Sequence, residues 1–92
     1  MYARIATFEG GTDIKGAVAG MEQDGPPEGL KAKEAYFFGD AESGKSIFVT
    51  FFETEEDMLA GDAMLNQMSP EDVGVGHRTG VELMEVHSHM IV

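Results

Sequence analysis

The sequence predicts a single α+β domain, residues 1–92, in which two helices cover one face of a four-stranded antiparallel sheet. The first observation is a run of β-branched and aromatic residues at 46–52, which is typical of a strand buried on both faces. The second is that apolar residues recur at helical spacing in 14–21 and again in 58–68. The third is the order of the segments, strand–helix–strand–strand–helix–strand, which is typical of a ferredoxin-like βαββαβ layout.

The composition excludes several classes of function. The 92 residues include no cysteine, which excludes disulfides, thiolate catalysis and cysteine-ligated zinc or iron–sulfur centres. The formal net charge of −11 opposes binding to nucleic-acid phosphates and to anionic lipid surfaces. No apolar run is long enough to span a membrane, and no basic-then-apolar segment opens the chain. We therefore expect a cytoplasmic protein that binds neither nucleic acid nor membrane.

The chain begins with a predicted strand and helix. Residues 3–8 form a short strand with Arg4 in its middle, and the glycine pair at 10–11 ends it. Thr12 or Asp13 can then cap a helix, since both side chains accept hydrogen bonds from free backbone N–H groups. The apolar stripe of this helix consists of Ile14, Ala17, Val18 and Met21.

Two adjacent strands follow, joined by a hairpin. A turn-rich stretch at 24–29 separates the first helix from the second strand, residues 30–38, which ends in three aromatic residues. Residues 39–45 form the hairpin loop that leads into the central strand at 46–52.

The second helix follows the central strand directly. Thr54 and Asp57 form a capping box at its start, and the local excess of acidic residues there suits a helix N-terminus. The apolar stripe that faces the strand consists of Met58, Gly61, Met64, Leu65 and Met68.

The last quarter of the chain is predicted to be mostly loop and strand. Ser69 and Pro70 indicate one further helical turn. Residues 73–80 hold three glycines and predict a loop, and residues 81–87 predict the last strand. Residues 87–92 are a tail or a continuation of that strand.

The central strand predicts a second subunit. It is apolar on both faces, whereas the two helices can cover only one face of the sheet. We therefore expect a homodimer that forms through the other face of the sheet.

Four segments resemble a known superfamily. Residues 3–10, 40–45, 52–56 and 81–86 are similar to the turns and strand ends of the dimeric α+β barrel superfamily, in particular to its small antibiotic-biosynthesis-monooxygenase-like proteins. The resemblance implies a homodimer whose two sheets face each other as a barrel. It also implies activities such as cofactor-independent oxygenation of aromatic polyketides, haem degradation, or a non-oxygenase role. Related enzymes often carry a tryptophan where this chain has Phe52, and this chain has no tryptophan.

Aromatic side chains predict the walls of a pocket for a small aromatic molecule. Cofactor-independent oxygenation needs a pocket that holds an electron-rich ring and shields a carbanion from water. Core packing explains these rings equally well. The predicted substrate-binding residues are Tyr36, Phe38, Phe48, Phe52 and Asn66.

Two further residues are predicted to carry the chemistry of such a pocket. His77 can act as a general base near neutral pH, although an exposed histidine without a role is the better explanation of its position in a loop. Arg4 can stabilise an enolate-like anion, and we expect its side chain to point into the barrel, away from the helices. The alternative for Arg4 is a structural ion pair, with three candidate partners: Glu34, Glu53 and Glu85.

No cofactor and no metal is predicted. His87 and His89 alternate along one face of a strand, a spacing that can bind a metal through two ligands, but the sequence supplies no third. Two functional hypotheses therefore remain open. The first is a monooxygenase-like dimer that binds an aromatic or polyketide-like molecule. The second is a non-catalytic binding or stress-associated dimeric module whose pocket is filled by side chains.

Overall fold

The computed structural model describes residues 1–68 and 74–92, and six elements lie in the predicted order. The strands are β1 (Tyr2–Glu9), β2 (Ala32–Asp40), β3 (Lys45–Phe52) and β4 (His77–Glu85), and the helices are α1 (Ile14–Asp24) and α2 (Glu55–Leu65). The four strands form one antiparallel sheet in the order β2-β3-β1-β4. This arrangement confirms the predicted ferredoxin-like α+β fold.

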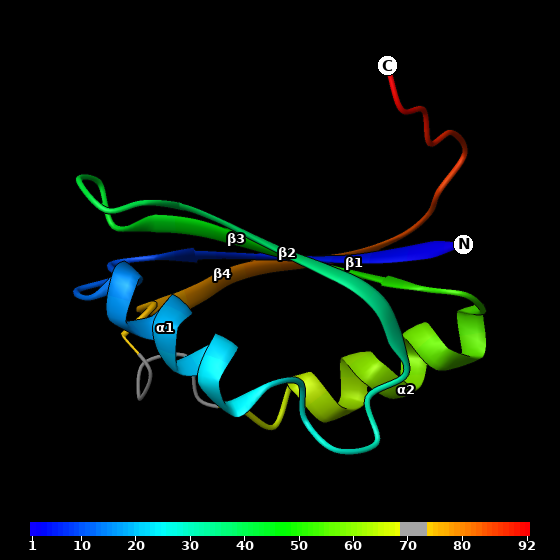
Figure 1. Ribbon diagram of the computed structural model, residues 1–92, viewed down its shortest axis with the longest axis horizontal. Coiled ribbons are helices and arrows are strands. Elements are labelled where there is room, and N and C mark those ends of the chain that lie inside the picture. The colour runs from blue at the N-terminus through cyan, green and yellow to red at the C-terminus, as the bar shows by residue number, and fades with distance from the viewer. Residues whose placement is uncertain (69–73) are drawn as a thin grey trace.

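The molecule has two layers, a sheet and a pair of helices (Figure 1). Both helices lie on one side of the sheet, which we call the helix face, and the C-terminal segment rises from the opposite side, the open face. Arg4 pairs with Thr50 across β1 and β3, and Ile5 pairs with Val49. Because side chains alternate along a strand, these two neighbouring pairs point to opposite faces of the sheet.

Side chains cap both helices at the predicted positions. Asp13 caps α1 by accepting a hydrogen bond of 3.0 Å from the backbone nitrogen of Gly16. Thr54 caps α2 by accepting one of 3.1 Å from the backbone nitrogen of Asp57. The helix α2 ends at Leu65, three residues before the end of its predicted apolar stripe.

Several predicted boundaries are wrong. The loop predicted at 73–80 is β4 from His77 onward, because pairing with β1 holds this glycine-containing stretch extended. That strand ends at Glu85, so residues 86–92 form a segment without regular structure. The second strand is also shifted from the predicted 30–38. The helical turn predicted at Ser69 and Pro70 lies outside the described residues.

Glycines bring three loops together at one end of the sheet. The backbone nitrogen of Gly11 donates to the carbonyl oxygen of Gly44 at 2.9 Å, which ties the end of β1 to the β2–β3 hairpin. Gly76 has a φ of 86°, and a Cβ atom there would lie 2.1 Å from the carbonyl oxygen of Glu9. This end of the sheet therefore requires glycine for both its backbone conformation and its close contacts.

The hairpin turn beside this glycine corner is held by Asp40. Ser43 and the backbone nitrogen of Glu42 donate to the two carboxylate oxygens of Asp40, at 3.0 and 3.1 Å. These hydrogen bonds, chiefly that from Ser43, lower the pKa of Asp40.

The buried core lies between the sheet and the helices. Phe52 is fully buried against α2, where Gly61 lets the helix approach its ring. The other buried apolar residues of this core are Ala6, Ile14, Ala17, Met58 and Val75, whereas Ala3 is buried on the open face, where it pairs with Phe51. Within the described ranges, no helix has the length and apolar character that crossing a membrane requires.

Candidate functional site

The structure divides the predicted site residues between the two faces of the sheet. Arg4 and Asn66 meet on the helix face, whereas Tyr36 and Phe38 lie on the open face. Phe52 packs under α2, and Phe48 shares its face because the two are four residues apart on one strand. The predicted residues therefore do not form one pocket.

On the helix face, Arg4 is at the centre of a polar network. The residue is 2% exposed, and its Nε donates to Asp62 at 2.8 Å. Its Nη2 donates to the amide oxygen of Asn66 at 3.0 Å, and Asn66 donates in turn to Asp62 at 3.3 Å. Arg78, at the start of β4, donates to the same amide oxygen of Asn66. The network links β1, β4 and the end of α2.

The expectation that Arg4 points away from the helices is wrong. The helix face can hold its charge because α2 presents Asp62 and Asn66, one turn apart, to the sheet. The ion-pair interpretation fits this geometry, but the partner is Asp62 and not one of the three glutamates. The polar residues Asp62 and Asn66, at four-residue spacing between the apolar residues of this stretch, are the sequence signal that could have identified this partner.

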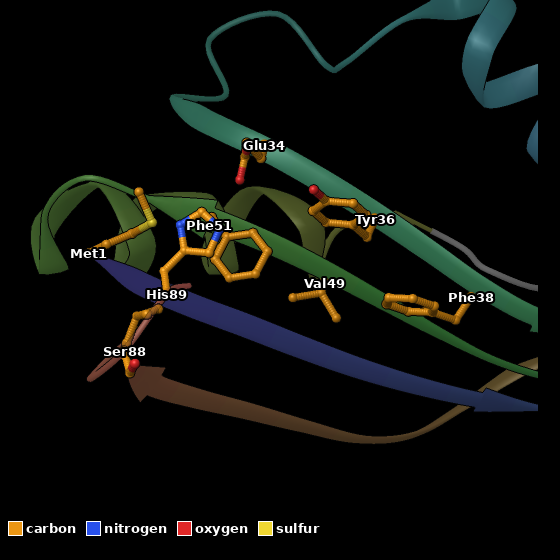
Figure 2. Close-up of a pocket in the computed structure, with 9 residues that line it drawn as sticks. Met1, Glu34, Tyr36, Phe38, Val49, Phe51, Ser88 and His89 are labelled. Atoms are coloured by element: carbon orange, nitrogen blue, oxygen red, sulfur yellow. The ribbon is translucent and has the colours of Figure 1, made fainter. Parts of the chain in front are cut away.

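The open face carries a groove with a volume of about 350 Å³ (Figure 2). Its floor is aromatic: the rings of Tyr36 and Phe38 lie stacked along β2 with centroids 6.1 Å apart. Phe51 of β3 meets the ring of Tyr36 edge-on, also at 6.1 Å. The lining residues are Met1, Glu34, Tyr36, Phe38, Val49, Phe51, Val86, Ser88 and His89.

The segment that follows β4 forms one wall of this groove. The backbone nitrogen of Val86 donates to the carbonyl oxygen of Met1 at 2.8 Å, and this bond fixes the start of the segment beside β1. Figure 2 places His89 close to Phe51, opposite the aromatic row of β2. Flat aromatic and aliphatic surfaces with Glu34, Ser88 and His89 at the edge suit a flat, mainly apolar molecule.

Two of the seven predicted site residues line this groove, Tyr36 and Phe38. Sequence reasoning missed Val49, and it counted Phe51 among the aromatic residues that could form a pocket wall without including it in the predicted binding residues; pairing across the β2–β3 hairpin places both on the face of Tyr36. The sequence gives no signal for the wall formed by residues 86–89, because the apolar residues of that segment follow neither helical nor strand periodicity.

His77 is far from the groove. It is exposed at the first position of β4, beside Gly10 and paired with Glu9. The groove lies over β2 and β3, which β1 separates from β4, and His77 is not among its lining residues. His77 and Arg4 thus contact neither each other nor the groove lining.

Two buried hydroxyl groups face the interior of the helix side. The side chains of Ser46 and Thr50 have no hydrogen-bond partner among the described residues, and Thr50 is fully buried opposite Arg4. Among residues 1–68 and 74–92, no group of three or more histidine or acidic side chains could hold a metal ion.

A second, shallower groove lies between α2 and the outer strand β4. It is lined by Tyr2, Met58 and Leu83 together with two acidic residues, Glu55 and Glu85. The charge of Glu85 is the main cause that raises the pKa of Tyr2 above its ordinary value.

Together, these features define a class: a small ferredoxin-like α+β protein with a buried arginine–aspartate pair on one face of its sheet and an aromatic groove on the other. No protein-family model, no curated protein and no solved structure matches the chain. The resemblance to the dimeric α+β barrel superfamily stays a prediction from the sequence.

Proposed function

We propose that this chain forms a homodimer through the open face of its sheet and binds a flat, mainly apolar small molecule in the aromatic groove. The observation that carries the proposal is the groove itself. Its volume of about 350 Å³ falls within the range of small-molecule sites, and aromatic rings form its floor. The polar groups at its edge would orient a ligand that carries a hydroxyl or carbonyl group.

The composition of the open face supports the dimer. Residues 3–7 of β1 and 47–51 of β3 place three side chains each on this face, and none of the six is charged. Large apolar side chains stay exposed there: Phe38 is 56% exposed, Tyr36 51% and Ile47 40%. Contiguous exposed apolar surface marks an interaction site. A second copy offers a face of the same shape whose central strands β1 and β3 are likewise uncharged, as a two-fold interface requires, while Glu34 and Glu82 lie on the outer strands β2 and β4.

The geometry favours binding over catalysis. Cofactor-independent oxygenation would need a base and an anion-stabilising group at the ligand, and Arg4 is instead bound to Asp62 and Asn66. His77 lies outside the groove lining. We therefore place non-catalytic binding ahead of the monooxygenase, with an open groove in place of the pocket filled by side chains that the second hypothesis assumed.

The dimer is tested by charge insertion on the two faces. Ile47→Lys adds a charge to a partly exposed position of the open face, so the monomer should fold while the dimer dissociates. Ala19→Lys, on the exposed side of α1, adds the same charge elsewhere and should leave the dimer intact. Sedimentation equilibrium measures both. A wild-type chain that sediments at 9.9 kDa at micromolar concentration would contradict the proposal.

Ligand binding is tested with a neutral aromatic fluorophore, N-phenyl-1-naphthylamine. Its emission should rise on binding to the dimer, and Tyr36→Ser should weaken the affinity about tenfold, which corresponds to about 1.4 kcal/mol. Lys15→Ser, on exposed α1, is the control and should bind as the wild type does. Equal affinities for all three proteins would exclude the groove as the binding site.

A further inference from the structure

We infer that the apolar end of the C-terminal segment, residues 90–92, of one copy packs over the aromatic groove of the other copy and closes its open side. The inference rests on the proposed dimer and adds to it: the groove is complete only when the partner supplies these three residues.

The first observation is the exposure of three successive apolar residues. Met90 is 76% exposed, Ile91 89% and Val92 fully exposed, which are the highest values among the large apolar side chains described. Burial of such side chains is a main source of association free energy. The tip of this segment thus offers apolar surface that its own subunit does not cover.

The second observation is the direction of the segment. Its start is fixed by the bond between Val86 and Met1, and in Figure 1 it rises from the sheet on the side opposite the helices. That is the side on which the proposed partner lies. His89 is the last residue of the segment that lines the groove of its own subunit. Residues 90–92 do not line that groove.

The third observation is the reach of the segment. Two sheets that pack face to face are about 10 Å apart. From residue 86 to residue 92 an extended chain spans at most about 20 Å, so the tip can cross this gap. In a two-fold dimer each tip would reach the partner, and the two contacts would be equivalent.

The receiving surface has matching chemistry. Tyr36 and Phe38 are each more than half exposed at the rim of the groove, and Val49 and Phe51 lie next to them. Glu34 is the acidic residue in this lining, and residues 90–92 carry no charged side chain that it would repel. Packing of residues 90–92 over the rings of Tyr36 and Phe38 removes both apolar surfaces from water, which is more favourable than leaving both exposed.

The contact is tested by photo-cross-linking in dimers mixed from ¹⁴N and ¹⁵N chains. Benzophenone-alanine at position 91 should cross-link to the peptide that contains Tyr36 and Phe38, and in an equal mixture about half of the cross-linked pairs should combine the two isotopes. The same group at Gln23, on exposed α1, is the control and should not label that peptide. Cross-links found only within a single isotope, or to the helix face, would overturn the inference.

A second measurement uses the dissociation constant of the dimer. The triple variant Met90→Ser, Ile91→Ser and Val92→Ser should raise it at least about tenfold, because three buried apolar side chains are lost. The matched control, Leu59→Ser with Met68→Ser, removes two exposed apolar residues from the helix side and should leave it unchanged. A stable dimer with unchanged affinity in the triple variant would overturn the inference but leave the proposed function standing. A monomeric wild type would overturn both.

Discussion

Among the described residues, Arg4 is the charged residue that is buried, and its burial depends on the ion pair with Asp62. A guanidinium in a poorly hydrated interior costs several kcal/mol unless it is paired and hydrogen-bonded. Here Asp62 supplies the opposite charge and Asn66 a further acceptor. The pair thus serves as a connection between β1 and α2, and a ligand would have to break it to use Arg4.

We predict that Arg4→Met and Asp62→Leu each lower the free energy of unfolding by about 3 kcal/mol, because each leaves the other charge without its partner. The double variant should recover to within about 1 kcal/mol of the wild type, since no orphaned charge is left. Urea denaturation at a fixed protein concentration measures all three.

The control for this cycle is the exposed ion pair between Lys33 and Glu53, with side chains 56% and 69% exposed. Lys33→Met should change the free energy of unfolding by less than about 0.5 kcal/mol. If Arg4→Met were equally mild, the network would be dispensable and Arg4 would be available for another role.

At the scale of the elements, glycine has opposite effects in the two helices. Gly61 lies in α2 where a Cβ atom would be 2.6 Å from the ring of Phe52, whereas the Cβ position of Gly20 in α1 has no neighbour within 4 Å. The first glycine allows the helix to contact the sheet. The second only weakens its helix.

We therefore predict that Gly61→Ala destabilises the protein by about 1–2 kcal/mol, because overpacking against a buried ring exceeds the gain in helix propensity. Gly20→Ala should stabilise it by about 0.5–1 kcal/mol, since only propensity changes. Thermal unfolding of the two variants side by side gives the comparison. If both variants shifted the unfolding temperature equally and in the same direction, the ring of Phe52 would have room to move away from the added Cβ atom.

The elements were predictable from the sequence where the signal is local. Thr54 and the stripe from Met58 predict α2, and the run at 46–52 predicts β3, because capping and periodicity depend on nearby residues only. The start of β4 was not predictable, since pairing with β1 holds the stretch around Gly80 extended. The prediction of the orientation of Arg4 was wrong for the same reason, because its partner Asp62 lies 58 residues away in the sequence.

For the whole molecule, the dominant quantity is the net charge of −11. Two copies repel each other at long range, while the open faces that would meet carry little charge. We predict that the dimer tightens when the ionic strength rises from about 0.01 M to about 0.15 M, because the screening length falls from about 30 Å to about 8 Å. Sedimentation at the two salt concentrations measures this. Weaker association in salt would indicate attractive ion pairs across the interface.

The strand order has a consequence for the chain as it leaves the ribosome. The first strand made, β1, is central, and its partners β3 and β4 are synthesised about 40 and 75 residues later. One edge of β1 therefore stays unpaired until the stretch from His77 to Glu85 has emerged. During that interval the nascent chain exposes an apolar strand edge, the feature that recruits chaperones or drives aggregation. The yield of folded protein in the cell should thus depend on how fast β4 is synthesised as much as on the stability of the folded state.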